Sequence, residues 1–325
     1  MPAACTPVIG TPKPLDSSQS ATVVTVAAEE RVFAGHYPGF PIFPGVCIVE
    51  HVHRSARDTL PDREGAAGGV WELAAVESTR FLSPVFPGDT LTIELTWSRV
   101  GDAWRCKAVA ASQRGTAAQV RLRYEAATAT ATATATAPGT VPPTAAARAQ
   151  APTRPDGATA MGAAAIKQVL PHRYPMLLVD RVLRRVPGEH LVAHKAVTCN
   201  EPWYQDLPPQ ATEDDHAYPH VLLVESWCQS AGILIAAERP NPDVLSGQVM
   251  LFGSISDIRF TGRVRPGQVM EHHVRLSRAL SDTVVFEGEC LVDGEVVAEI
   301  GRVVMAMRPA SELTAHAPAR AEESS

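Results

Sequence analysis

Two separated stretches of this sequence carry side chains that could transfer protons. The first contains His36 in a segment rich in Gly and Pro, and Gly45 follows it at the start of an apolar run. Histidine is the usual general base near neutral pH. The first amides of a helix have no partners within the helix and lie at the positive end of its dipole. A carbonyl oxygen placed against the Gly45 N–H would therefore be polarised as in an oxyanion hole.

The second stretch places an acid and an amide inside an apolar segment. Residues 221–237 are apolar on nearly every side of a helix, which predicts a helix that is buried throughout. Glu225 and Gln229 are one helical turn apart in this segment and therefore share a face. A buried carboxylate needs a partner or a proton. We expect the apolar setting to raise the pKa of Glu225 and to leave its carboxyl group protonated.

The remaining clusters of titratable residues have simpler interpretations. Glu50 stands on a predicted amphipathic helix, where we expect it to be solvated or ion-paired. His51 and His53 are two residues apart and do not share a helix face, which argues against a metal site. The acidic run 213–215 before His216 is typical of a solvated insert.

The elements that must position these residues occur twice along the chain. Residues 21–125 and residues 161–309 both contain strand-like segments and one helix, in the same order. The stretch 126–160 is rich in Ala, Thr and Pro, which predicts a disordered linker. The tails, 1–20 and 310–325, are expected to be unstructured. The pattern predicts two α+β domains, each with a buried helix wrapped by antiparallel strands.

Composition narrows the class of protein further. A chain of 325 residues suits two domains, and a net charge of -6 argues against nucleic acid as a partner. No apolar run is long enough to predict a membrane span, and the N-terminus lacks the regions of a signal peptide. The six cysteines are dispersed without a CxxC pair, as is typical of reduced thiols. These features predict a cytoplasmic protein.

Both halves resemble one family. Residues 35–46 are similar to the active-site segment of bacterial 3-hydroxyacyl-[acyl-carrier-protein] dehydratases, whose pattern is roughly G-H-F-P-x-x-P-V-M-P-G-V. In the second half, segments 170–182, 200–204 and 224–229 resemble the opening motif, the strand before the active-site histidine and the helix motif of the same family. The resemblance covers about residues 22–125 and 161–308, and its paired motifs make it specific.

The resemblance implies the hot-dog fold, an antiparallel sheet around one long helix, present here as two tandem domains that form an intramolecular pseudo-dimer. Family active sites form between two such domains, with His and Gly from one and the acid and Gln from the other. Carried over to this chain, His36 and Gly45 come from the first domain, and Glu225 and Gln229 from the second. Fused double hot-dog dehydratases of polyketide synthases divide these residues in the same way.

The second potential site is incomplete by the same comparison. Glu50 takes the position of the acid, but Arg54 stands where the family has Gln. In the second domain the histidine is missing, and His220 replaces the helix-opening Gly. The resemblance therefore implies one working composite site. An alternative is a second site in which His216 or His220 faces Glu50.

The reaction that the resemblance implies is dehydration of a 3-hydroxyacyl thioester to the trans-2-enoyl product in fatty-acid or polyketide synthesis. His36 would remove the proton next to the thioester carbonyl, and the Gly45 N–H would stabilise the developing negative oxygen. Glu225, oriented by Gln229, would protonate the leaving hydroxyl group. No metal or redox cofactor is expected. The expected partner is an acyl carrier protein that presents the substrate on phosphopantetheine, and the chain is expected to dimerise further.

Two other functions compete with this interpretation. Other hot-dog enzymes hydrate enoyl thioesters or hydrolyse acyl thioesters. A non-catalytic acyl-binding or scaffold subunit is the alternative outside the enzymes, although the surviving His, Gly, Glu and Gln residues argue against it.

Overall fold

The computed structural model of the chain describes residues 12–14, 18–61, 70–127, 160–238 and 240–314. The predicted linker 126–160 lies almost entirely outside these described residues, and so do most of the two predicted tails.

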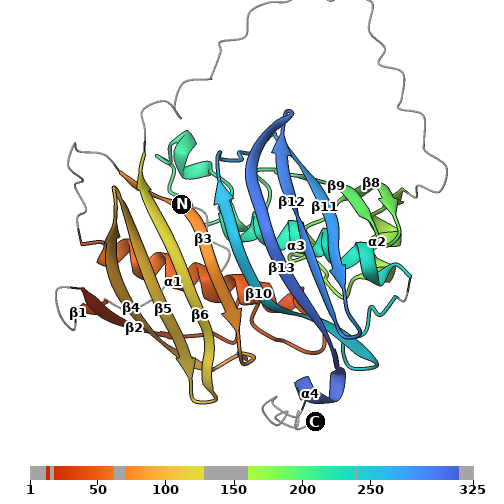
Figure 1. Ribbon diagram of the computed structural model, residues 1–325, viewed down its shortest axis with the longest axis horizontal. Helices are drawn as coiled ribbons and strands as arrows, with labels where there is room; N and C mark the ends of the chain where they lie inside the picture. Colours follow the sequence, from red (N-terminus) through yellow and green to blue (C-terminus); the bar gives the residue numbers. More distant parts are fainter. Residues whose placement is uncertain (1–11, 15–17, 62–69, 128–159, 239, 315–325) are drawn as a thin grey trace, which may run out of the picture.

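All strands of the described chain join one antiparallel sheet (Figure 1). The strands of the first half are β1 (Lys13–Pro14), β2 (Gln19–Thr25), β3 (Trp71–Phe81), β4 (Thr90–Val100), β5 (Ala103–Ser112) and β6 (Gly115–Ala126). The strands of the second half are β7 (Met161–Gly162), β8 (Arg181–Val186), β9 (His190–Ala196), β10 (Gln248–Phe260), β11 (Val269–Ala279), β12 (Thr283–Val292) and β13 (Glu295–Pro309).

The order of the strands reveals an internal two-fold relationship. The sheet runs β1-β2-β4-β5-β6-β3-β10-β13-β12-β11-β9-β8-β7, so each half repeats the other outward from its centre. At that centre β3 pairs antiparallel with β10, with Arg80 opposite Ser254 and Ala75 opposite Arg259. The predicted α+β fold of two tandem hot-dog domains, docked as an intramolecular pseudo-dimer, is confirmed.

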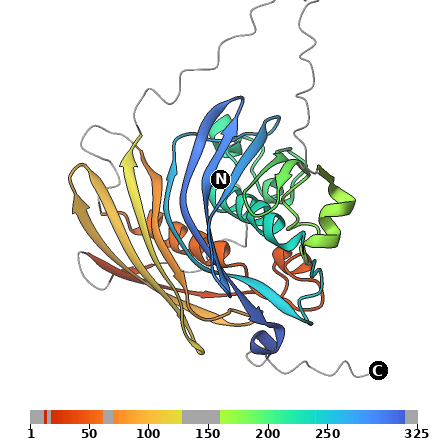
Figure 2. The ribbon, with the colours of Figure 1, turned by 45° about the vertical axis from the view of Figure 1, so that its right-hand side comes forward.

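One long helix from each half lies on the same side of this curved sheet (Figure 2). Helix α1 (Gly45–Thr59) follows Pro44, and helix α3 (His220–Ala236) follows Pro219. Residues 221–234 of α3 are all buried, as its apolar composition predicts. Shorter helices are α2 (Ala163–Val169) and α4 (Ala310–Thr314).

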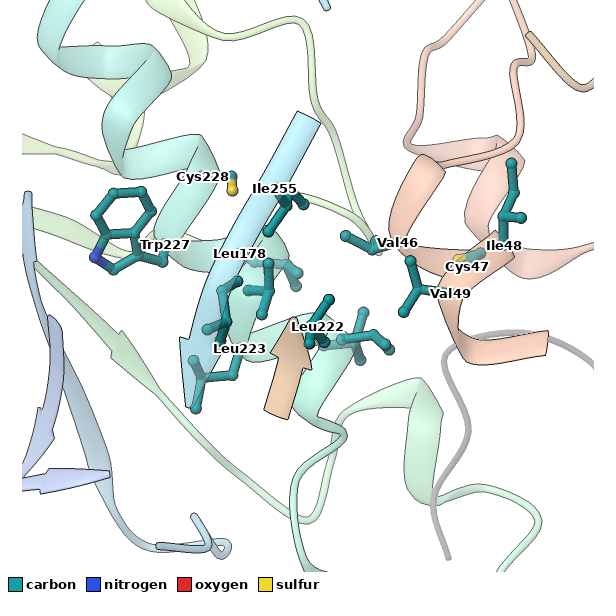
Figure 3. Close-up of a cluster of buried hydrophobic side chains, with 14 of the residues drawn as sticks. Val46, Cys47, Ile48, Val49, Leu178, Leu222, Leu223, Trp227, Cys228 and Ile255 are labelled. Atoms are coloured by element: carbon teal, nitrogen blue, oxygen red, sulfur yellow. The ribbon is translucent and has the colours of Figure 1, made fainter. Parts of the chain in front are cut away.

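The core between the sheet and the helices is built by alternation along the strands. In β4, Leu91, Ile93 and Leu95 are buried while the residues between them are exposed, because successive side chains of a strand point to opposite faces. Between the helices, Val46 and Val49 of α1 gather with Leu222 of α3 in one apolar cluster (Figure 3). The same cluster holds the two domains together.

The C-terminal boundary differs from the prediction. Helix α4 lies in the stretch 310–325 that was expected to be an unstructured tail. Ala310 and Leu313 are both 5% exposed and pack into a small apolar cluster with Tyr37, Phe40 and Val249. The helix is short and only partly apolar, so its burial depends on this tertiary contact and not on a local signal. Strand β1 similarly lies within the predicted N-terminal tail.

Two chain-level expectations concern the thiols and the membrane. The described cysteines are free, with Cys199 exposed and the other four buried, and Cys5 lies outside the described residues. Across the described ranges, no helix is long and apolar enough to cross a membrane.

Candidate active site

His36 stands in the loop that follows a short 3-10 helix, Arg31–Ala34. A contact within this loop orients its side chain. Its Nδ1 lies 3.0 Å from the carbonyl oxygen of Ile42. Because a carbonyl can only accept, Nδ1 carries the hydrogen and the lone pair is on Nε2. The side chain is buried at 6% exposure and stacks on Tyr37 with 4.2 Å between ring centroids.

The loop around His36 packs directly on a backbone segment of the other domain. The Arg173 N–H donates to the Gly35 carbonyl at 3.0 Å. A Cβ atom at Gly35 would lie 2.1 Å from the Arg173 carbonyl oxygen, so only glycine permits this approach. The segment that follows α2 therefore brings His172 to His36, with ring centroids 5.2 Å apart.

Glu225 and Gln229 face the same segment from α3, as their spacing predicts. Gln229 Nε2 donates to Glu225 Oε1 at 2.9 Å and to the Met176 carbonyl at 2.7 Å. The Leu178 N–H donates to Gln229 Oε1 at 2.9 Å. These backbone partners fix the orientation of the Gln229 amide, which then holds the Glu225 carboxyl group.

The two domains thus meet in one compact group of proton-transfer side chains. One ligand-type atom each of His36, His172 and Glu225 lies within 4.8 Å of the others. His172 Nε2 is 3.4 Å from Glu225 Oε1, while Glu225 Oε2 has no hydrogen-bond partner among the described atoms. Two imidazoles and a carboxylate are also a metal-binding set of residues. Gln229 and His172 both contact Glu225 Oε1, a set of contacts that also suits an acid–base group.

Electrostatics set the resting protonation of this group. Burial, followed by the nearby His172, lowers the pKa of His36 to about 4. His36 is therefore neutral near pH 7, as a general base must be. Burial alone would raise the pKa of Glu225, but the hydrogen bond from His172, the two neighbouring imidazoles and Gln229 outweigh it and lower that pKa. The expectation of a raised pKa and a protonated Glu225 is wrong, because it considered burial without these partners.

Gly45 opens α1 beside an apolar cavity of about 170 Å³. The cavity is lined by His36 and Gly45 from the first domain and by Phe252 and Leu313 from the second. A Cβ atom at Gly45 would lie 2.8 Å from Phe81 Cε1, so a side chain there would press on the cavity wall. Glu225 is fully buried and is not among the residues that line the cavity.

A larger open groove of about 790 Å³ is lined by residues of β8–β13. It is lined largely by charged side chains of both signs, and none of the four predicted site residues reaches it. Of these two cavities, the smaller one is lined by two of the predicted site residues, His36 and Gly45.

The residues of the incomplete second site make contacts with other groups. Glu50 is 6% exposed and accepts a hydrogen bond from Arg54 Nε at 2.8 Å, so it is ion-paired but not solvated. The His220 ring stacks on Phe260 with centroids 4.1 Å apart. His216 Nδ1 contacts the Thr212 carbonyl at 2.8 Å. Glu50, His216 and His220 thus have partners other than one another.

Sequence reasoning missed His172 and Tyr37 as members of the site. Both stand in motifs that were recognised, but neither motif alone indicates where its side chain points. Tyr37 packs edge-on against His172 with centroids 5.0 Å apart. A His between Pro171 and Arg173, at the start of a motif that continues into the apolar run 176–179, was the available signal.

Comparisons with known proteins identify related dehydratases. Residues 170–301 match the family model of the FabA-like domain, and residues 14–120 match that of the ApeI dehydratase. The chain is 39% identical over 131 residues to the 3-hydroxyacyl-[acyl-carrier-protein] dehydratase FabZ of Nitratidesulfovibrio vulgaris, covering 40% of this chain and 81% of the relative. It is 42% identical over 136 residues to FabZ of Shewanella frigidimarina, covering 41% of this chain and 83% of the relative.

Solved structures share the double-domain architecture. The dehydratase domain of PpsC from Mycobacterium tuberculosis, in complex with C12:1-CoA, superposes with a TM-score of 0.59 at 13% identity. That match covers 93% of this chain and 99% of the other. The dehydratase domain of RzxB from Pseudomonas fluorescens matches with a TM-score of 0.56 at 14% identity, over 88% of this chain and 94% of the other. At these sequence identities the structural similarity establishes the fold alone.

Proposed function

The chain belongs to the 3-hydroxyacyl-[acyl-carrier-protein] dehydratase family, and we propose that it removes water from a 3-hydroxyacyl thioester at a single site built from both domains. The observation that carries this proposal is the meeting of His36 from the first domain with Glu225 and His172 from the second, all within 4.8 Å. The apolar cavity beside His36 and Gly45 offers the space for an acyl group.

The proposed base is His36. Its Nδ1–H is held by the Ile42 carbonyl, so Nε2 is free to take the proton from the carbon next to the thioester carbonyl. As that proton leaves, negative charge develops on the thioester oxygen. We assign the stabilisation of this oxygen to the Gly45 N–H at the start of α1, since Gly45 lines the same cavity as His36.

The proposed acid is Glu225. It would transfer a proton to the 3-hydroxyl oxygen as the carbon–oxygen bond breaks, which releases water and leaves the trans-2-enoyl thioester. Gln229 orients the carboxyl group through its hydrogen bond to Oε1. The lowered pKa of Glu225, where the His172 hydrogen bond and charge outweigh burial, means that a second group must hold the departing proton at rest.

The elimination moves two protons and needs neither a metal ion nor a redox cofactor. We further propose that the substrate arrives on the phosphopantetheine arm of an acyl carrier protein, as the names of the FabZ relatives indicate for those proteins. Dimerisation of the fused chain stays a prediction.

The test is loss of one water from 3-hydroxyacyl thioesters of an acyl carrier protein, followed by mass spectrometry. The wild type is expected to be active, and His36→Ala and Glu225→Gln to lose roughly hundredfold or more of the rate. Glu50→Gln is the matched control, since Glu50 occupies the equivalent position of α1 and pairs with Arg54. It is expected to keep the wild-type rate.

Other outcomes identify the competing functions. A wild type that is inert on every chain length would indicate a non-catalytic acyl-binding subunit. Release of the free acid would indicate a thioesterase. A preference for adding water to enoyl thioesters of coenzyme A would indicate a hydratase. Loss of activity in Glu50→Gln would show that the working site uses the other pair of elements.

A further inference from the structure

His172 has no role in the site as the sequence defines it, yet it is enclosed within that site. The residue is 8% exposed, and its Nε2 faces Glu225 Oε1 at 3.4 Å. Its Nδ1 has no hydrogen-bond partner among the described atoms. The Glu225 carboxylate is therefore the polar group that the His172 imidazole contacts.

Few titratable or charged groups surround His172. His36 and Tyr37 face it from the first domain, and Glu225 faces it from α3. Arg173, the next residue, turns its guanidinium away to the carbonyls of Lys167 at 3.0 Å and Leu170 at 2.7 Å. Burial raises the pKa of Tyr37, so this phenol stays neutral.

The number of protons that the reaction moves indicates a role for His172. Dehydration needs one group without a proton to accept one from the substrate, and another group to donate one to the leaving hydroxyl. His36 is neutral and fits the first role. Glu225 is ionised at rest and has no proton of its own to give. A buried carboxylate without a compensating charge is costly, and an imidazolium beside it makes the pair neutral.

We propose that His172 and Glu225 share one proton, and that this pair, not Glu225 alone, stores the proton that leaves with the substrate hydroxyl. The inference rests on the proposed function and deepens it. His172 is in this view a positioning residue: it acts through Glu225 and does not itself touch the substrate.

The cycle balances with these three side chains. At rest His36 is neutral, and the His172–Glu225 pair holds one proton and has no net charge. His36 Nε2 takes the substrate proton, the carbon–oxygen bond breaks, and the pair delivers its proton through Glu225 to the departing oxygen. His36 is then an imidazolium and the pair an anion. Transfer of the proton from His36 back to Glu225, within a group no wider than 4.8 Å, restores the resting state.

The experiment is the pH profile of kcat/KM for His172→Gln, which keeps an N–H donor but cannot hold the proton. The plateau is expected to fall about tenfold or more, since an acid of the wrong protonation state loses much of its contribution. The basic limb is expected to move to lower pH by on the order of one unit, because the carboxyl of Glu225 must then hold the proton by itself. The acidic limb is expected to move to higher pH, because the repulsion that helps lower the pKa of His36 is gone.

His220→Gln is the matched control, since His220 is likewise a histidine of the second domain, but it stands at the incomplete site, where its ring stacks on Phe260. It is expected to keep both limbs of the profile. If His172→Gln lowers the rate equally at every pH, or leaves it unchanged, the shared proton is refuted. That result is distinct from failure of the proposed function, in which the wild type itself does not dehydrate the substrate or His36→Ala remains active.

Discussion

The Gly35 carbonyl accepts a hydrogen bond from the Arg173 N–H at 3.0 Å, and the space beyond Gly35 is filled by the Arg173 carbonyl. This backbone contact joins the two domains one residue before His36 and one residue after His172. The distance between the two imidazoles therefore depends on how closely these two backbones approach.

Gly35→Ala is expected to separate the two halves of the site. Its Cβ would lie 2.1 Å from the Arg173 oxygen, and a backbone atom cannot rotate away as a side chain can. We expect the free energy of unfolding to fall by roughly 1–3 kcal/mol. We expect kcat to fall by about a hundredfold, because a small displacement of His36 spoils the alignment for proton transfer. Chemical denaturation and the dehydration assay measure the two effects.

Gly162→Ala provides the control for this variant, since a Cβ at Gly162 would meet nothing within 4 Å. It is expected to leave kcat unchanged and to lower the free energy of unfolding by at most about 1 kcal/mol, since Gly162 is the N-cap of α2. A fully active Gly35→Ala enzyme would show that the contact with Arg173 does not position His36.

Much of the site could be predicted because its residues stand in local patterns. His36 and Gly45 are close in sequence, and Gly45 is the first residue of helix α1. Glu225 and Gln229 share a helix face by their spacing alone, and the structure joins them at 2.9 Å. The fold class followed from one buried helix and several strands in each half, an order that repeats along the chain.

The parts that could not be predicted depend on packing between the domains. His172 reaches Glu225 only because the segment after α2 crosses to the loop of the first domain. The same contact reverses the expected direction of the Glu225 pKa, since burial was evident from the sequence and the His172 partner was not. Helix α4 is stabilised by side chains remote in sequence, which local propensity does not reveal.

A second prediction concerns the wall behind the helix-opening glycine. Gly45→Ala is expected to lower kcat, because its Cβ would press on the Phe81 ring at 2.8 Å and displace the amide from the cavity. Phe81→Leu in the same chain removes that ring and is expected to restore part of the rate. The coupling energy from the double-mutant cycle in kcat/KM is expected to be about 1–3 kcal/mol. Additive effects of the two substitutions would show that Gly45 is required for a reason other than contact with Phe81.

A third prediction links buried histidines to stability. Four histidines have a pKa lowered mainly by burial from 6.5, to about 4 for His36 and His220 and to about 3 for His53 and His272. Below pH 6.5 the unfolded chain binds protons that the folded chain excludes, so the free energy of unfolding falls as pH falls towards 4. Each such histidine contributes a slope of up to about 1.4 kcal/mol per pH unit in this window.

His272→Gln isolates one of these contributions, because His272 is fully buried and contacts Ser226 at 2.7 Å. Urea denaturation at pH 6.5 and at pH 5 is the measurement. Between these values the variant is expected to lose roughly 1–2 kcal/mol less of its unfolding free energy than the wild type. An identical loss in both proteins would mean that His272 takes up protons equally in its folded and unfolded states.

The last prediction concerns the proposed acyl cavity, whose lining includes Leu313 of α4 and Phe252 of β10. Leu313→Ala removes apolar volume from a cavity of only about 170 Å³, so longer acyl chains gain room that the wild type denies them. Each added methylene that becomes buried is worth about 0.8 kcal/mol, or roughly three- to fourfold in kcat/KM. We therefore expect the ratio of kcat/KM for long over short 3-hydroxyacyl substrates to rise by about that factor per carbon.

Leu280→Ala is the control, because Leu280 is 57% exposed and lies away from the cavity. If Leu313→Ala changes all chain lengths by one common factor, α4 supports the fold without contacting the acyl chain, and the selection of chain length must come from the rings of Phe81 and Phe252, which pack 6.4 Å apart.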